Sequence, residues 1–239
     1  MAERNIGVAA LEILNAGQLE IRDVNGGEKP FLYASGNWGP GYLSVKSLVG
    51  RKEIIRYLVR ELAEFVAKRA SRLDFIAGNV TGGLVPGWVL SEYLEPILRR
   101  TVPFVYVRDT RKKGGQKELV TGDAHNPKIR VGNNVLVVEE LVNFAHTTCN
   151  SAIALREKGY TVTHAACILF YQNPKAIAVL KQAGIEMIYL LTLLELLDVA
   201  EKHNTHPKRL IEEFRVYLKD PLAWQEKREL KPVKEGGTR

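Results

Sequence analysis

Short apolar runs alternate with amphipathic helical patterns from about residue 75 to residue 202, and this alternation restricts the fold more than any other feature. The strand-like runs lie at 75–77, 104–107, 135–138, 162–170 and 187–191, and the helical patterns lie at 84–94, 147–158, 174–182 and 193–202. Strands that are separated by helices pair in parallel through crossover connections. The sequence therefore predicts an α/β fold, with a central parallel sheet flanked by helices.

The N-terminal part of the chain has a different pattern. Apolar residues at helical spacing from Ile6 to Leu14 predict a helix that ends near Gly17. Residues 26–50 mix aromatic residues with Gly, Pro and Ser, which predicts short strands and turns that form a small cap, here called the hood. A second amphipathic pattern follows at 54–66.

Length and composition suit one α/β domain with additions, because 239 residues that are 46% hydrophobic can bury a sizeable core. We divide the chain into an N-terminal helix and hood (1–50), an α/β core (51–203) and a C-terminal extension (204–239). The extension carries helical patterns around 210–218 and 221–228.

Charge and cysteine content bear on the environment of the protein. The formal charge of +7 suits a phosphorylated substrate, a nucleic acid or a solvated basic surface. Cys149 and Cys167 form neither a CxxC pair nor a metal-binding pattern, which favours a reducing compartment. The N-terminus has no signal-peptide pattern, and the apolar stretch 185–199 is too short and too often interrupted by acids to cross a membrane. We expect a cytoplasmic protein without membrane contact.

Open parallel sheets bind ligands at the carboxyl ends of their strands, so the residues that follow each strand are the first candidates for a site. Residues 78–83 (GNVTGG) follow one strand and precede a helix, where Gly78, Gly82 and Gly83 would let backbone N–H groups approach an anion. The alternative is that these glycines only close the turn.

Paired carboxylates follow the most apolar strand. Glu139 and Glu140 offer acceptor oxygens for a diol such as the ribose 2′ and 3′ hydroxyls, and residues 143–148 then lead into a helix. The alternative is two solvated acids that stabilise the helix N-terminus.

Two further segments could reach the same edge of the sheet. Residues 105–122 carry several cations around two glycines and read as a mobile basic loop, which could close over a leaving diphosphate. A solvated loop and an RNA-binding patch are the alternatives. Residues 30–42 combine aromatic rings with exposed backbone, which predicts either a slot for a planar base or a packed cap without ligand.

In this order the four segments resemble the orotate phosphoribosyltransferase family, from the first helix to about Lys202. The residues that carry the resemblance are Ser35, Gly36, Pro40 and Tyr42 in the hood, Gly78, Gly82 and Gly83, the strand residues Tyr106, Val107 and Arg108, and the run from Val135 to Val142. The resemblance implies the type I phosphoribosyltransferase fold, with its hood.

Beyond Val142 the chain departs from the family pattern. Asn143, Phe144, Ala145 and His146 stand where the family has threonine and glycine around a 5′-phosphate, and Thr147 and Thr148 are displaced toward the helix. Losing two hydrogen bonds to phosphate would cost about 3–6 kcal/mol, and an alanine in a left-handed turn would cost about 1–2 kcal/mol. Backbone donors and the side chains of Asn143, His146, Thr147 and Thr148 could compensate.

The resemblance implies transfer of a phosphoribosyl group from phosphoribosyl diphosphate to a pyrimidine-like base such as orotate, with release of diphosphate. Mg²⁺ would be bound through the diphosphate of the substrate rather than by protein ligands. The implied catalytic residues are Arg108, Lys112, Glu139 and Glu140. The implied substrate-binding residues are Ser35, Tyr42, Gly78, Thr81, Gly82, Gly83, Arg111, Lys113, Asn143, Ala145, His146, Thr147 and Thr148.

The basic loop also departs from the family, since Asp109 follows the first arginine and Gly114 replaces a histidine, while Lys112 aligns with the catalytic lysine. In the family this lysine reaches the neighbouring subunit's site, which implies a homodimer. The alternative function is a non-catalytic sensor of a nucleotide or phosphoribosyl diphosphate, or a partner subunit on the same fold. No helix-turn-helix pattern precedes the domain, so DNA is not an expected partner, and RNA binding stays open.

Overall fold

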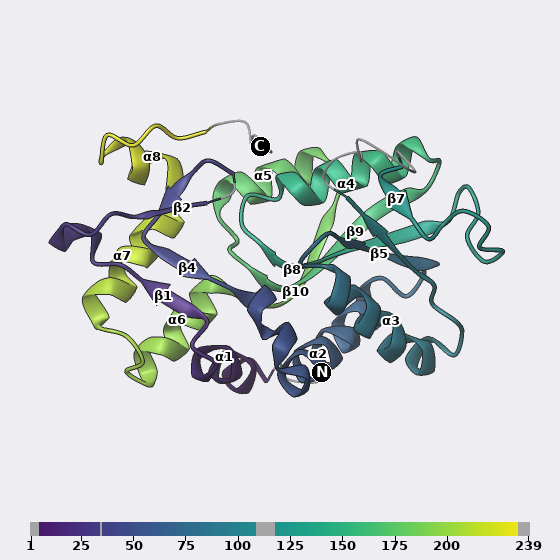
Figure 1. The fold of residues 1–239 in the computed structure, drawn as a ribbon, viewed down its shortest axis with the longest axis horizontal. Coiled ribbons are helices and arrows are strands. Elements are labelled where there is room, and N and C mark those ends of the chain that lie inside the picture. Colours follow the sequence, from purple (N-terminus) through teal and green to yellow (C-terminus); the bar gives the residue numbers. More distant parts are fainter. Residues whose placement is uncertain (1–4, 34, 109–117, 234–239) are drawn as a thin grey trace.

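A six-stranded sheet lies at the centre of the protein in the computed structural model, which describes residues 5–33, 35–108 and 118–233 (Figure 1). Its spatial order is β10-β9-β8-β5-β6-β7, and all neighbours are parallel except β6 and β7. The strands are β5 (Phe75–Asn79), β6 (Phe104–Val107), β7 (Val120–Thr121), β8 (Asn134–Val142), β9 (Thr161–Phe170) and β10 (Glu186–Thr192). The predicted parallel sheet is confirmed, and the short antiparallel β7 is an addition that the sequence pattern did not show.

Helices cover both faces of this sheet. Figure 1 shows α1, α2 and α3 on one side of it and α4 and α5 on the other. The helices are α1 (Ile6–Asn15), α2 (Lys52–Arg69), α3 (Leu84–Leu98), α4 (His146–Glu157), α5 (Pro174–Gln182) and α6 (Leu193–Lys202). Because alternate strand residues face opposite sides, Phe75 and Ala77 join the core under α4, whereas Ile76 joins the core under α2 and α3.

The order of the strands reverses between β5 and β8. From β5 the chain moves to β6 on one side, and it then returns to β8 on the other side of β5. Loops that leave two such strands diverge to opposite faces of the sheet, which opens a crevice at their carboxyl ends. The ligand site is therefore expected between the ends of β5 and β8.

Two strand ends differ from the predicted bounds. We expected the strand to stop before the paired acids, but β8 continues to Val142, because it stays in register with β9 through Glu139–Cys167 and Leu141–Leu169. In the same way Gly78 belongs to β5 rather than to a loop, since it pairs with Tyr106 and Val138. Both acids are thus held by a sheet rather than by a flexible segment.

The hood consists of short strands and turns, as the sequence predicts. The elements in and beside it are β1 (Leu19–Ile21), η1 (Val24–Gly26), β2 (Phe31–Leu32), β3 (Trp38–Gly39), β4 (Gly41–Leu43) and η2 (Val45–Gly50). Antiparallel pairing joins β1 to β4 and β2 to β3. The hood lies at the carboxyl end of β8, where η2 contacts that strand.

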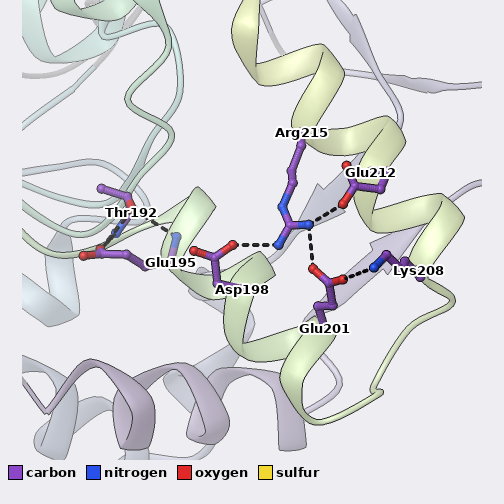
Figure 2. Close-up of polar contacts among 7 residues, drawn as sticks. All are labelled: Thr192, Glu195, Asp198, Glu201, Lys208, Glu212 and Arg215. Atoms are coloured by element: carbon purple, nitrogen blue, oxygen red, sulfur yellow. Dashed lines mark hydrogen bonds and ion pairs between the residues drawn. The ribbon is translucent and has the colours of Figure 1, made fainter.

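The C-terminal extension is α7 (Lys208–Lys219) and α8 (Pro221–Glu226), and a charge cluster ties it to the core (Figure 2). Arg215 of α7 forms ion pairs with Asp198 and Glu201 of α6, both at 2.6 Å. Figure 2 also shows the hydrogen bonds between Thr192 and Glu195 that cap the start of α6. The ion pairs of Arg215 add to the apolar face of α7, where Leu210, Ile211, Phe214 and Tyr217 are buried in the core.

Buried amides join α8 to the hood. The Gln225 side chain is fully buried, accepts from the Trp38 N–H at 2.8 Å and donates to the Asn37 oxygen at 3.2 Å. The Asn37 oxygen also accepts from the Val233 N–H at 2.9 Å. Buried polar groups with full sets of partners fix one arrangement of the segments that they connect. The extension is an integral support of the hood.

Candidate functional site

A cavity of about 270 Å³ opens where the carboxyl end of β8 meets the hood. We call it the switch-point cavity. It is lined by Tyr33, Ser35, Tyr42, Leu43, Val45 and Lys46 from the hood, by residues 139–148 and by Tyr171. Three of the four predicted segments thus contribute: the aromatic hood, the paired acids and the loop 143–148.

The two acids reach this cavity from one strand end but have different surroundings. Glu139 is buried, and its carboxylate accepts a hydrogen bond from the side chain of Asn79 at the end of β5. This bond spans the point where the strand order reverses. Glu140 is partly buried and packs on Gly82. The pair therefore fixes acceptor oxygens at the base of the cavity.

Burial raises the pKa of the Glu140 carboxyl, whereas the backbone N–H groups of Glu140 and Leu141 and the charge of Lys46 act in the opposite direction. Glu140 consequently protonates at a higher pH than an exposed glutamate does. A carboxylate in this setting responds strongly to any cation that enters the cavity, because the low-dielectric surroundings screen charge poorly.

The three glycines of the 78–83 segment have different roles. A Cβ on Gly83 would lie 2.0 Å from the carbonyl oxygen of Val138, and one on Gly78 would lie 2.4 Å from the carbonyl oxygen of Gly83. These two glycines let α3 start directly against the sheet, which is the turn-closing alternative. A Cβ on Gly82 would instead lie 1.7 Å from a carboxylate oxygen of Glu140. Gly82 is therefore the member of this segment that faces the acids.

None of Gly78, Thr81, Gly82 and Gly83 lines the switch-point cavity, and Thr81 is exposed. The segment adjoins the cavity through the contact between Gly82 and Glu140. Its predicted contact with diphosphate stays a prediction.

The loop 143–148 begins α4 at the edge of the cavity. Ala145 has φ 64° and ψ 6°, which is the left-handed conformation. The sequence analysis expected this conformation, and it is unfavourable for alanine. Asn173 is fully buried and donates to both the backbone and the side-chain oxygen of Asn143, at 2.8 and 3.0 Å. No side chain of the described residues caps the start of α4. Its first N–H groups therefore have no side-chain cap, and residues 146–148, which carry them, line the cavity.

His146 and the two threonines complete this loop. Burial, followed by the charge of Lys175, lowers the pKa of His146, so its imidazole is neutral near pH 7. Thr148 is buried and Thr147 is half-buried, and both line the cavity. The loop offers neutral donors rather than positive charge.

The basic segment lies partly outside the described residues. Arg111, Lys112 and Lys113 belong to residues 109–117, which the structure does not describe, and their predicted roles stay predictions. Arg108 is described but does not line the cavity, and its guanidinium donates to the Tyr106 hydroxyl at 2.8 Å. The structure thus does not bring Arg108 to the acids.

Tyr171 and Lys46 line the cavity but were not predicted as site residues, whereas Tyr33 belongs to the predicted aromatic segment 30–42. Tyr33 and Tyr171 form aromatic walls beside the predicted Tyr42, and burial raises the pKa of both hydroxyls, which stay protonated. Tyr171 directly follows β9, so the strand-end rule could have found it. Lys46 also lines the cavity, but no motif marks it.

Known proteins share sequence and fold with this chain. No protein-family model matches the chain. The orotate phosphoribosyltransferase of Ruegeria sp. (strain TM1040) is 30% identical over 212 residues, which are 87% of this chain and 89% of that one. The chain belongs to the orotate phosphoribosyltransferase family. The family enzyme of Phocaeicola vulgatus is 28% identical over 216 residues, which are 90% of this chain and 95% of that one.

Solved structures show the same fold for this family member. UMP synthase of Leishmania donovani matches with a TM-score of 0.72 at 21% identity, over 90% of this chain and 42% of that one. Orotate phosphoribosyltransferase of Aeropyrum pernix matches with a TM-score of 0.62 at 23% identity, over 83% and 99% of the two chains. The type I phosphoribosyltransferase fold that the resemblance implied is thereby confirmed.

Residues 5–33, 35–108 and 118–233 contain no group of three or more His, Cys, Asp or Glu side chains that could hold a metal ion. In the same ranges no helix has the length and apolar character needed to cross a bilayer.

Alanine substitutions should distinguish the turn-closing glycine Gly83 from Gly82, which contacts Glu140. Gly83→Ala is expected to lower the free energy of unfolding by about 3 kcal/mol or to prevent folding, because its Cβ meets backbone that cannot move aside. Gly82→Ala should cost less than about 1 kcal/mol, because the end of the Glu140 side chain can shift. Urea denaturation measures both. Equal losses of stability would contradict these assignments.

Proposed function

We propose that this chain transfers the phosphoribosyl group of phosphoribosyl diphosphate to a pyrimidine-like base such as orotate and releases diphosphate. The observation that carries the proposal is the composition of the switch-point cavity, which joins two carboxylates, an open helix N-terminus and aromatic walls in one space. Membership of the orotate phosphoribosyltransferase family supports it independently.

We propose one part of the substrates for each wall of the cavity. Glu139 and Glu140 would accept hydrogen bonds from the ribose hydroxyls, and the first turn of α4 would bind the 5′-phosphate through backbone N–H groups. Tyr42 and Ser35 would contact the base, together with the tyrosine walls. Thr81 and Gly82 would face the diphosphate from the side of β5, and Gly78 and Gly83 would close the turn that positions them.

In the reaction the bond between ribose C1 and the diphosphate oxygen breaks, and a bond forms between C1 and a ring nitrogen of the base. Positive charge develops on the ribose as diphosphate leaves with the electron pair. The carboxylates of Glu139 and Glu140 stabilise that charge, while Arg108, Arg111, Lys112 and Lys113 are proposed to neutralise the leaving group. The remaining rate acceleration would come from positioning the two reactants in line.

We also propose Mg²⁺ as the metal, bound through the diphosphate of the substrate. The described residues fit this role, because two carboxylates stand beside the cavity and no third ligand joins them. An ion with so few protein ligands takes most of its oxygens from phosphate and water. When bound, Mg²⁺ would neutralise charge on the leaving diphosphate.

A sensor that binds phosphoribosyl diphosphate without turnover is the second candidate. The strained Ala145 and the bonds that hold Asn143 to Asn173 favour it, because they limit how far the loop can close on a phosphate. The two functions share the cavity and differ in turnover.

Diphosphate release from phosphoribosyl diphosphate and Mg²⁺ with a panel of bases tests the proposal. We expect release with at least one pyrimidine base and loss of release when EDTA removes the metal. Glu139→Gln should lower kcat about 100-fold, because it removes a charge from the site while keeping its shape. Glu157→Gln, on the exposed end of α4, is the matched control. Binding without release for every base would establish the sensor instead.

We propose a homodimer that uses the surface of α3 around Val85 and Trp88. The Trp88 side chain is 57% exposed and stacks edge-on against Phe104, with Val85 38% exposed one turn away. This surface lies beside the glycine segment, so a partner bound there would be near the site. Large exposed aromatic side chains mark association surfaces.

Light scattering tests the dimer. The wild type is expected at twice the chain mass, and Trp88→Glu is expected at the chain mass. Ile177→Glu changes an equally apolar residue, 47% exposed on α5, and should remain dimeric. A monomeric wild type at tens of micromolar protein would overturn the proposal.

We propose the cytoplasm as the compartment. Both cysteines are free thiols, Cys149 half-buried and Cys167 buried. Free thiols persist in reducing compartments.

A further inference from the structure

Lys46 lines the switch-point cavity and was given no role above. It lies in η2, which directly follows the hood strand β4, and its side chain is exposed. Among the described residues that line the cavity, Lys46 is the one lysine or arginine. Lys46 therefore supplies the positive charge among the described residues that line the cavity.

The surroundings of Lys46 leave that charge available. Its charge acts on Glu140, so the ammonium group lies within electrostatic reach of the acids at the base of the cavity. Within the described part of the chain, no carboxylate approaches Lys46 closely enough to form an ion pair, although many other surface cations have such partners. His146 cannot substitute for it, because burial keeps the imidazole neutral near pH 7.

The charge of the expected ligands gives a cation at this wall a role beside the acids, apart from the Mg²⁺ and basic segment proposed for the leaving diphosphate. Phosphoribosyl diphosphate carries several negative charges, and a base with a carboxylate carries one. Glu139 and Glu140 would repel both ligands, since like charges in a partly buried space interact strongly. A wall with two carboxylates and no cation would thus disfavour the substrates that the fold is built to hold.

We propose that Lys46 binds an anionic oxygen group of the substrates, either the carboxylate of the base or a phosphate of the phosphoribosyl donor. The inference rests on the proposed function for the identity of these ligands. Lys46 stands four residues after Tyr42, which places it on the base side of the cavity and next to the proposed ribose-binding acid Glu140. A lysine side chain suits this place because its ammonium is a compact charge on a flexible stem.

Lys46→Met tests the role by removing the charge and keeping most of the length. We expect the KM or Kd for the ligand that Lys46 contacts to rise roughly 10- to 100-fold, as the loss of a charged hydrogen bond predicts. Lys46→Arg should stay within about fivefold of the wild type, because the charge is kept. Lys52→Met, at the exposed start of α2 and outside the cavity, removes the same charge and should change neither constant.

Separate measurements for the two ligands identify the contact. A higher KM or Kd for the base alone indicates that Lys46 contacts the carboxylate of the base. Uracil, which lacks that group, should then bind equally well to the wild type and to Lys46→Met. A higher KM or Kd for phosphoribosyl diphosphate alone indicates that Lys46 contacts a phosphate. Calorimetry with ribose 5-phosphate and with diphosphate then shows whether this is the 5′-phosphate or the diphosphate. Constants within twofold of those of Lys52→Met for both ligands would overturn the proposal.

The outcome is distinguishable from failure of the proposed function. Turnover by the wild type tests the transferase, whereas the comparison of Lys46→Met with the wild type tests Lys46. If the wild type binds phosphoribosyl diphosphate without turnover, the calorimetric constants still decide the role of Lys46. If the wild type binds neither anion at millimolar concentration, Lys46 has no anion to bind and this proposal fails as well.

Discussion

Parallel pairing of β5 with β8 brings Asn79 and Glu139 together at one edge of the sheet, and the candidate site depends on this contact. The strand order reverses between these two strands, so the connection after β5 leads to α3 on one face and the connection after β8 leads to α4 on the other. The hydrogen bond that Asn79 donates to Glu139 offsets part of the cost of burying that carboxylate. The same reversal aims the N-terminus of α4 at the space above the acids.

Support for this space comes from both ends of the chain. The hood forms the aromatic wall, and α8 holds the hood through Gln225 and Asn37. Beneath that wall, the fully buried Tyr217 of α7 packs on Tyr33 and Trp224, with ring centroids 6.4 and 5.4 Å apart. The C-terminal helical extension is therefore connected to a cavity wall by continuous packing.

The sequence predicted the elements of the core well, because each buried strand leaves an apolar run and each covering helix leaves a 3.6-residue period. The sequence also predicted that Glu139 and Glu140 belong to the site and that Ala145 is left-handed, because these residues lie in one local motif. It could not predict which glycine faces the site, since Gly78, Gly82 and Gly83 look alike until their tertiary neighbours are known. Lys46 was not predicted for the same reason: its place in the cavity depends on how the hood folds over β8.

The central claim is that the switch-point cavity holds a phosphoribosyl group, and a crystal structure of the protein with phosphoribosyl diphosphate and Mg²⁺ tests it most directly. The account predicts the 5′-phosphate at the first turn of α4, next to His146 and Thr148, and the ribose hydroxyls within hydrogen-bond distance of Glu139 and Glu140. A ligand bound elsewhere on the molecule, or a cavity without ligand at saturating concentration, would contradict the account.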